Sequence, residues 1–195
     1  MASSSPTASS KAELRREALA RRDDLPADVR AAAAQTIATR PFPVTLPSGV
    51  VISGFSPMRS EINPWPLMRR LADQGAGLAL PVVMGRGRAL TFRAFAFGDP
   101  LASGVWGIRE PLPAAAVEPD IVLVPLAAFD RGGQRIGYGA GYYDLTLRAL
   151  RAVKPIVAIG LAYAAQEIAA VPFTPRDERL DLVLTEREVI DCRGA

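Results

Sequence analysis

A glycine-rich segment in the C-terminal half of the chain carries the residue types best suited to phosphate chemistry. Residues 129–144 read FDRGGQRIGYGAGYYD. The alternating Gly137, Gly139 and Gly141 leave main-chain N–H groups exposed, and a helix that starts behind them adds the positive end of its dipole. Arg135 contributes a planar donor fork that matches phosphate oxygens. The segment therefore predicts an anion-binding loop.

Asp144 closes this segment and falls in the first turn of the predicted helix, facing the same site. A carboxylate beside phosphates normally implies a Mg²⁺ ion between them. For the loop taken alone, a simpler interpretation stays open: a glycine-rich turn with core tyrosines, in which Asp144 only interacts with the helix dipole. The spacing is G-x-G-x-G and lacks the lysine of a P-loop, so it is a weak nucleotide motif by itself.

The composition excludes several kinds of catalytic site. The chain has no histidine and one cysteine, Cys192. This excludes Ser-His-Asp and Cys-His nucleophilic chemistry, histidine-bearing zinc sites and an internal disulfide. Any acid–base step must therefore use carboxylates, lysine, tyrosine or the substrate itself.

The charge and the apolar runs narrow the choice of partners and location. The net charge of +3 is spread along the chain, so it does not by itself indicate nucleic-acid binding and suits an anionic small molecule. No apolar run reaches the roughly 20 residues of a membrane span. Residues 1–10, MASSSPTASS, have the composition of a disordered tail and lack the apolar core of a secretion signal. We expect a cytoplasmic protein with no membrane partner and no nucleic-acid partner.

The elements that must position these residues alternate along the chain. Helical patterns cover residues 11–24, 26–40, 64–75 and 142–153. Segments of strand character cover residues 50–55, 77–83, 89–97, 121–129, 155–163 and 181–186. Strands that are apolar throughout are typical of a parallel sheet buried on both faces. The alternation predicts one α/β domain over residues 11–195, a monomer with a mainly parallel, open, Rossmann-like sheet and helices on both faces. The glycine-rich segment would then lie at the carboxyl edge of the sheet, where ligands bind.

Several motifs together resemble the 5-formyltetrahydrofolate cyclo-ligase family. RIGYGAGYYD, preceded by VPLAAFDRGG, is similar to the family signature. Lys11 and Arg15 in KAELR resemble its N-terminal Lys-x-x-x-Arg motif, and Glu61 in PMRSEINP resembles its folate-binding glutamate. Trp106 in VWGIREP and Asp181 in RDERLDLVLTE have counterparts in the same order. The resemblance covers roughly residues 11–190.

The resemblance implies an ATP- and Mg²⁺-dependent ligase that converts 5-formyltetrahydrofolate, with or without a polyglutamate tail, to 5,10-methenyltetrahydrofolate and releases ADP and phosphate. Lys11 and Arg15 project from one face of a helix and would clamp the polyphosphate, with Lys11 and Arg135 as the catalytic cations. The neighbouring Arg16, Arg21 and Arg22 are expected on a solvated helix face. The residues expected to bind ATP are Lys11, Arg15, Arg135, Gly137, Tyr138, Gly139, Ala140, Gly141, Tyr142 and Tyr143.

For the folate, one carboxylate, Glu61, can accept both the amino group and the ring N–H of a pterin. The other residues expected around the substrate are Phe55, Ser56, Met58, Trp106 and Tyr142. Aromatic and methionine side chains are also common in α/β cores, so that alternative stays open for them. The resemblance makes Asp144 and Asp181 the metal ligands, although Asp181 also fits the start of a strand.

One residue departs from the family pattern. The loop commonly reads Gly-Arg-Gly, and this chain has Tyr138 in the place of the arginine. A fixed charge beside the phosphates is thereby lost, and Arg131 or Arg176 would have to compensate. The alternative function is a non-catalytic relative that binds nucleotide or RNA on the same scaffold. A dinucleotide-binding oxidoreductase is disfavoured by the glycine spacing.

Overall fold

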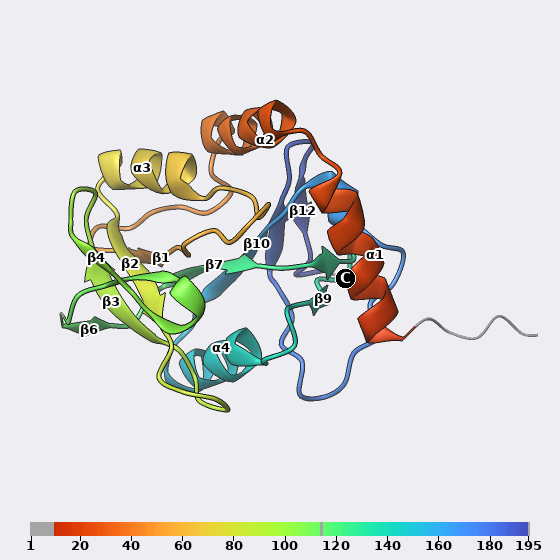
Figure 1. The fold of residues 1–195 in the computed structure, drawn as a ribbon. Helices are drawn as coiled ribbons and strands as arrows, with labels where there is room; N and C mark the ends of the chain where they lie inside the picture. The colour runs from red at the N-terminus through yellow and green to blue at the C-terminus, as the bar shows by residue number, and fades with distance from the viewer. Residues whose placement is uncertain (1–9, 114, 195) are drawn as a thin grey trace, which may run out of the picture.

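An eight-stranded sheet runs through the molecule, and helices cover both of its faces (Figure 1). The computed structural model describes residues 10–113 and 115–194, apart from the side chain of Trp106. The strand order is β12-β11-β10-β7-β1-β2-β3-β6. The strands are β1 Val51–Ser53, β2 Gly77–Val82, β3 Thr91–Phe95, β6 Ala116–Val117, β7 Ile121–Pro125, β10 Val157–Leu161, β11 Leu182–Leu184 and β12 Val189–Asp191.

The centre of this sheet is parallel and its edges are antiparallel. Strands β11, β10, β7, β1 and β2 run in one direction, and β12 and β3 run in the opposite direction. Strand β6 is antiparallel to β3 and therefore runs with the central strands. The expected mainly parallel α/β sheet is therefore confirmed. From β1 the chain passes to β2 on one side and later returns to β7 on the other, which makes the carboxyl ends of β1 and β7 a topological switch point.

Two apolar cores hold the helices against the sheet, because residues along β7 alternate between its faces. Ile121 and Leu123 pack with α2 (Ala27–Thr39) and α3 (Trp65–Asp73) on one face. Val122 and Val124 pack with α4 (Tyr142–Val153) on the other face. None of the helices in the described part of the chain is long and apolar enough to cross a membrane.

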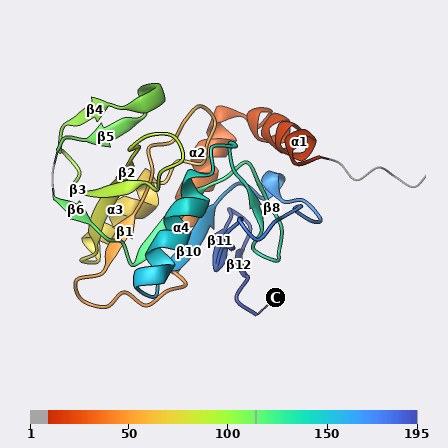
Figure 2. The ribbon, with the colours of Figure 1, turned by 90° about the horizontal axis from the view of Figure 1, so that it is seen from below.

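The remaining elements surround the carboxyl edge of the sheet. Helix α1 (Lys11–Asp23) starts from a capping box between Ser10 and Glu13, so Ser10 serves as its N-cap; residues 1–9 of the expected tail lie outside the described residues. A hairpin of β4 (Leu101–Ser103) and β5 (Arg109–Pro111) carries the short helix η1 (Val105–Gly107). Another short helix, η2 (Ala164–Gln166), packs against α1. Helix α1 and the β4–β5 hairpin lie on opposite sides of the molecule (Figure 2).

The prediction of one strand over residues 121–129 was wrong. The chain leaves the main sheet after Pro125, and Ala128–Phe129 form β8, which pairs with β9 (Arg135–Ile136) in a separate hairpin. Proline lacks the N–H group that a continued ladder would use, which suits a strand end. This hairpin carries the glycine-rich segment out of the sheet and toward α1.

Candidate active site

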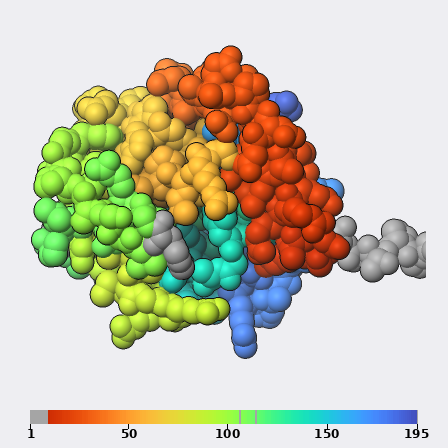
Figure 3. All heavy atoms as spheres, viewed as in Figure 1, coloured from red at the N-terminus to blue at the C-terminus, as the bar shows by residue number. Residues whose placement is uncertain are grey.

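A cavity of about 600 Å³ opens at the carboxyl ends of β1 and β7. Its walls are α1, residues 54–61 after β1 (the β1 loop), residues 137–141 (the glycine loop), the start of α4 and the β4–β5 hairpin. The space-filling view shows the hollow near the red α1, the orange β1 loop and the turquoise glycine loop (Figure 3). The cavity therefore lies at the switch point, where open α/β sheets bind ligands.

The structure brings most of the predicted site residues together in this cavity. Those that line it are Lys11, Arg15, Phe55, Ser56, Met58, Glu61, Arg135, Gly137, Tyr138, Gly139, Ala140, Gly141, Tyr142, Tyr143 and Asp144. The side chain of Trp106 lies outside the described residues. Asp181 is not among the described lining residues.

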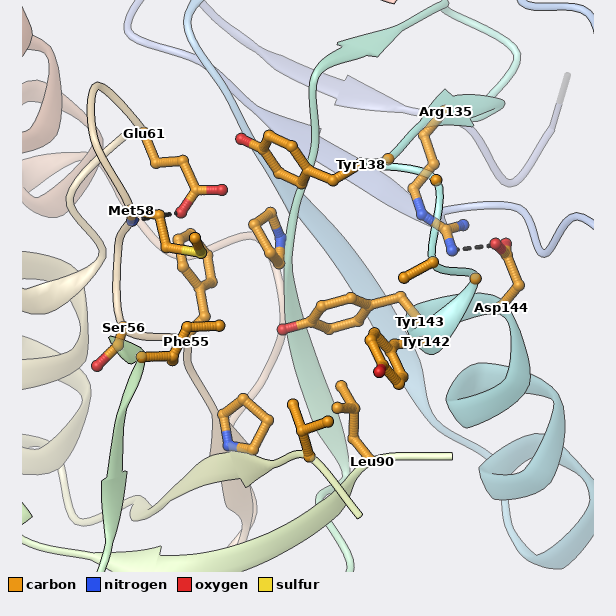
Figure 4. A pocket seen from close by; sticks show the side chains of 18 of the residues that line it. Phe55, Ser56, Met58, Glu61, Leu90, Arg135, Tyr138, Tyr142, Tyr143 and Asp144 are labelled. Atoms are coloured by element: carbon orange, nitrogen blue, oxygen red, sulfur yellow. Dashed lines mark hydrogen bonds and ion pairs between the residues drawn. The ribbon is translucent and has the colours of Figure 1, made fainter. Parts of the chain in front are cut away.

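Arg135 and Asp144 form an ion pair in the wall of the cavity (Figure 4). Arg135 Nη2 donates to Asp144 Oδ1 at 2.7 Å, and Nη1 donates to the carbonyl of Glu178. Arg135 is almost fully buried, and burial lowers the pKa of its guanidinium while Asp144 opposes that change. Gly141 has φ +71° as the N-cap of α4, a left-handed conformation that glycine adopts without strain. The loop thus ends at a helix N-terminus, whose dipole favours a bound anion.

Helix α1 is fastened across the cavity by its basic side chains. Lys11 Nζ donates to Asp177 Oδ1 at 2.7 Å, and Arg15 Nε donates to the carbonyl of Gly137 at 2.7 Å. Burial raises the pKa of Asp177, but the Lys11 and Thr174 hydrogen bonds outweigh it and keep the pKa below the usual range. Lys11 and Arg15 therefore reach the glycine loop and its surroundings from one helix face.

Glu61 lies in the opposite wall, among apolar side chains. Its Oε2 accepts from the main-chain N–H of Met58 at 2.7 Å, and Phe55 and Met58 line the same part of the cavity (Figure 4). Burial raises the pKa of Glu61, and the Tyr138 hydroxyl, the Met58 N–H and Arg22 act in the other direction. A largely desolvated carboxylate beside flat apolar walls is suited to a ring with adjacent N–H donors.

Sequence reasoning missed Arg22 and Asp177. Arg22 was expected on a solvated face, but it is 2% exposed and lines the cavity. Its position offered a signal, because Arg15, Ala18 and Arg22 are spaced three and four residues apart and therefore share one helix face. Asp177 offered no such signal, since its role depends on a contact with Lys11, 166 residues away.

The predicted compensation for Tyr138 was also wrong. Arg131 is exposed and pairs with Glu167 and Glu188, and neither it nor Arg176 is among the described lining residues. Tyr138 instead accepts a hydrogen bond from Nη1 of Arg22 at 2.5 Å.

The carboxylates at the cavity fit a magnesium ion in part as predicted. Arg135 and the Glu178 N–H both bond to Oδ1 of Asp144, and among the described residues no hydrogen bond is seen to Oδ2, which could therefore meet a cation. Asp177 lines the same cavity. Mg²⁺ commonly takes one or two carboxylates and completes its shell with phosphate oxygens and water. No group of three or more His, Cys, Asp or Glu side chains in residues 10–113 and 115–194 is placed to hold a metal ion by itself.

The assignment of Asp181 to the metal is not supported by its position. Asp181 Oδ2 accepts from the Ala158 N–H at 2.7 Å and from Arg151 Nη2 at 3.0 Å. The first contact fixes the start of β11 beside β10, and the second joins it to α4. Asp181 therefore serves the sheet, which was the alternative left open by the sequence.

Known proteins resemble this chain over nearly its full length. Residues 7–186 match the model of the 5-formyltetrahydrofolate cyclo-ligase family. A 5-formyltetrahydrofolate cyclo-ligase of Mycolicibacterium smegmatis is 32% identical over 190 residues, which span 93% of this chain and 96% of the relative. The solution structure of Aquifex aeolicus 5,10-methenyltetrahydrofolate synthetase superposes with a TM-score of 0.73 at 30% identity, covering 95% of this chain and 94% of that one.

A more distant structure shares the fold. The 5,10-methenyltetrahydrofolate synthetase of Mycoplasma pneumoniae superposes with a TM-score of 0.69 at 22% identity, covering 91% of this chain and 99% of that one. The family match spans most of the chain, including the β1 loop, the glycine loop and α4. This chain therefore belongs to the 5-formyltetrahydrofolate cyclo-ligase family of enzymes.

Proposed function

We propose that this chain converts 5-formyltetrahydrofolate to 5,10-methenyltetrahydrofolate, using ATP and Mg²⁺ and releasing ADP and phosphate. The observation that carries the proposal is the cavity itself, because it sets a buried carboxylate with apolar walls opposite a glycine loop and a buried arginine. These are the features needed to hold a pterin against a polyphosphate. The names of the relatives support the same reaction.

The reaction needs little covalent help from the protein. The formyl oxygen attacks the γ-phosphorus of ATP, a new O–P bond forms, and the bond from that phosphorus to ADP breaks. N10 then attacks the activated formyl carbon, loses its proton, and the carbon–oxygen bond breaks to release phosphate. In such phosphoryl transfer, positioning and charge neutralisation supply most of the catalysis. A site without histidine is therefore adequate.

The cations of the cavity have matched roles in this proposal. Arg135 is rigidly held by Asp144 and the Glu178 carbonyl, so it can stabilise charge on the transferred phosphate without moving. Lys11 is held at the cavity by Asp177 and is more accessible than Arg135. The glycine loop and Arg15 hold the remaining phosphates. Asp144 and Asp177 would hold the Mg²⁺ ion, which neutralises phosphate charge when bound.

Glu61 fixes the folate. Its carboxylate must be ionised to accept two N–H donors from the pterin, and its raised pKa brings its protonation closer to neutral pH. Folate binding should therefore weaken as the pH falls through the Glu61 pKa, and kcat/KM for 5-formyltetrahydrofolate should show an acid limb.

The test mixes the purified protein with 5-formyltetrahydrofolate and Mg-ATP and follows the near-ultraviolet absorbance of the methenyl product. Replacing Arg135 by lysine should lower kcat about 100-fold, because the fork that contacts the phosphate is lost. Replacing Glu61 by glutamine should instead raise KM for the folate by about tenfold or more, because a charge-assisted contact is lost.

Arg131→Lys is the matched control for these variants, since Arg131 is an exposed arginine whose ion pairs lie outside the cavity. It should retain wild-type kcat and KM. Absence of an ATP-dependent rise, from folded wild-type protein that still binds ATP, would contradict the proposal.

A further inference from the structure

Arg22 is the most deeply buried charged side chain that contacts the cavity. It sits in the last turn of α1 with 2% of its surface exposed. Its Nη1 donates to Tyr138 Oη at 2.5 Å, and its Nε donates to Ser60 Oγ at 2.9 Å. Its Nη2 lies 3.3 Å from Asp23 Oδ1. Burying a guanidinium is costly unless its donors are used, so these contacts must all be held in place.

The partners of Arg22 belong to two different walls of the cavity. Tyr138 is in the glycine loop, 116 residues along the chain from Arg22. Ser60 directly precedes Glu61 in the β1 loop, and its hydroxyl also donates a hydrogen bond to Asp23. The guanidinium carbon lies 5.9 Å from the centre of the Tyr138 ring, which adds a cation–π contact. One side chain from α1 therefore ties together the loops of the two proposed substrates.

The direction of the hydrogen bond at Tyr138 has a further consequence. The Tyr138 oxygen accepts from Arg22, so its own proton remains available to another acceptor. Figure 4 shows Glu61 and Tyr138 facing one another across the cavity. The Tyr138 hydroxyl and the charge of Arg22 both oppose the burial-driven rise in the pKa of Glu61, which agrees with a chain of contacts from Arg22 through Tyr138 to the carboxylate.

We propose that Arg22 is a positioning residue that acts through Tyr138 and Ser60 to hold Glu61 for the folate. The same contacts fix the β1 loop against the glycine loop. This inference rests on the proposed function and extends it. It also accounts for the departure from the family pattern at Tyr138. Arg22 of α1 supplies a positive charge in place of the one lost from the loop. Tyr138 links this charge to the Glu61 carboxylate, and not to the phosphates.

The test is a double-mutant cycle of Arg22→Met and Tyr138→Phe, with KM for 5-formyltetrahydrofolate and kcat as readouts. Each single change should raise that KM about tenfold, the size expected for losing a hydrogen bond to a charged group. Because both changes break the same chain of contacts, the double variant should also show about a tenfold rise, whereas independent effects would multiply to about a hundredfold. We expect kcat to change by less than about threefold.

Arg21→Met is the matched control. Arg21 precedes Arg22 on α1, but it is exposed and donates to the carbonyl of Ala165, away from the cavity. The control removes the same charge and an anchor of the same helix, so a merely structural role of α1 would raise KM in both variants. If Arg22→Met does not fold, Arg22→Lys serves in its place, because a single ammonium group cannot keep both the Ser60 and the Tyr138 contacts.

A pH profile separates positioning of Glu61 from a general loss of order. The groups that face Glu61 are Arg22 and Tyr138, with Tyr143 and Tyr163 also nearby. Removing the Tyr138 hydroxyl or the Arg22 charge takes away a group that favours the ionised carboxylate. The acid limb of kcat/KM should therefore move to higher pH in both variants and stay in place in Arg21→Met.

Titration of the Glu61 carboxylate by carbon NMR in the ligand-free protein makes the result independent of the reaction. A higher pKa in both variants would support the inference even if wild-type protein formed no methenyl product, an outcome that would contradict only the proposed function. Unchanged Glu61 titration in both variants, or effects on KM that multiply in the double variant, would overturn it.

Discussion

At the scale of single residues, two of the cations near the glycine loop are already held by carboxylates. Arg135 pairs with Asp144 and Lys11 pairs with Asp177, both at 2.7 Å. These pairs orient the donors before a nucleotide arrives, and they place two carboxylates where a magnesium ion would meet the phosphates. Asp181 has a different task, because its carboxylate bonds to β10 of the sheet and to Arg151 of α4.

The metal assignment leads to a comparison of three amide variants. Asp144→Asn and Asp177→Asn should each raise the Mg²⁺ concentration needed for half-maximal turnover about tenfold, since a neutral amide is a weaker ligand. Asp181→Asn should leave this requirement unchanged and lower the free energy of unfolding by about 1–2 kcal/mol through its weakened contacts with Arg151 and Ala158. Turnover against Mg²⁺ and urea denaturation measure the two effects. A higher Mg²⁺ requirement in Asp181→Asn alone would restore the original assignment.

The sequence predicted the residues whose meaning is local and missed those whose meaning depends on distant partners. Glu61, Arg135 and Asp144 stand in recognisable motifs and were placed in one site, as the structure has them. Arg22 and Asp177 gain their roles from partners 116 and 166 residues away. No local pattern states that an arginine at the end of a helix will be buried against a loop of another element.

At the scale of elements, the β8–β9 hairpin contains Arg135 and places the glycine loop next to α1. Its turn packs closely against the C-terminal strands, because the Leu180 N–H donates to the carbonyl of Gly133 at 2.9 Å. Gly133 has φ +81°, and a Cβ atom there would lie 2.5 Å from the Leu180 carbonyl oxygen and 2.9 Å from Cys192 Cβ. The position thus requires glycine for both conformation and space.

Gly133→Ala should therefore lower the free energy of unfolding by about 3 kcal/mol or more, from the left-handed conformation together with the main-chain clash. Gly75→Ala is the matched control, since Gly75 has φ +93° but nothing within 4 Å of its added Cβ. That variant should lose only about 1 kcal/mol. Urea denaturation of both variants measures the difference. Equal losses would show that the hairpin turn shifts to accept the methyl group.

Predicting the elements succeeded where hydrophobic periodicity is strong. Helix α4 was predicted with the bounds that the structure shows, Tyr142–Val153, and β10 was found within its predicted segment. The failures lie where pairing decides the structure. Residues 121–129 are apolar throughout, so their hydrophobic pattern did not mark the break, and Pro125 was the one local signal for it. The two-residue strands β6, β8 and β9 are too short to show a period.

At the scale of the whole molecule, the sheet separates two apolar cores that stabilise different parts of the site. The core of α2 and α3 supports the β1 loop through Phe55 and through Ile62, which directly follows the loop. The other core holds α4, which directly follows the glycine loop, through Leu147 and Leu150, and it extends to Cys192 near the C-terminus. The two walls of the cavity are therefore anchored on opposite faces of one sheet, and the contacts of α1 join them.

Chemical labelling of the Cys192 thiol can test whether the two cores unfold together. Its thiol is 1% exposed, and burial raises its pKa to about 11, whereas an unfolded thiol titrates near 8.5. At pH 8 the folded protein should therefore react with a thiol reagent at least about 10³-fold more slowly than the denatured chain, since reaction needs both access and the thiolate. With increasing urea, labelling should accelerate in parallel with the loss of helical circular dichroism. Fast labelling before any such loss would show instead that β12 and the C-terminal segment open separately, and that the two cores do not unfold as one unit.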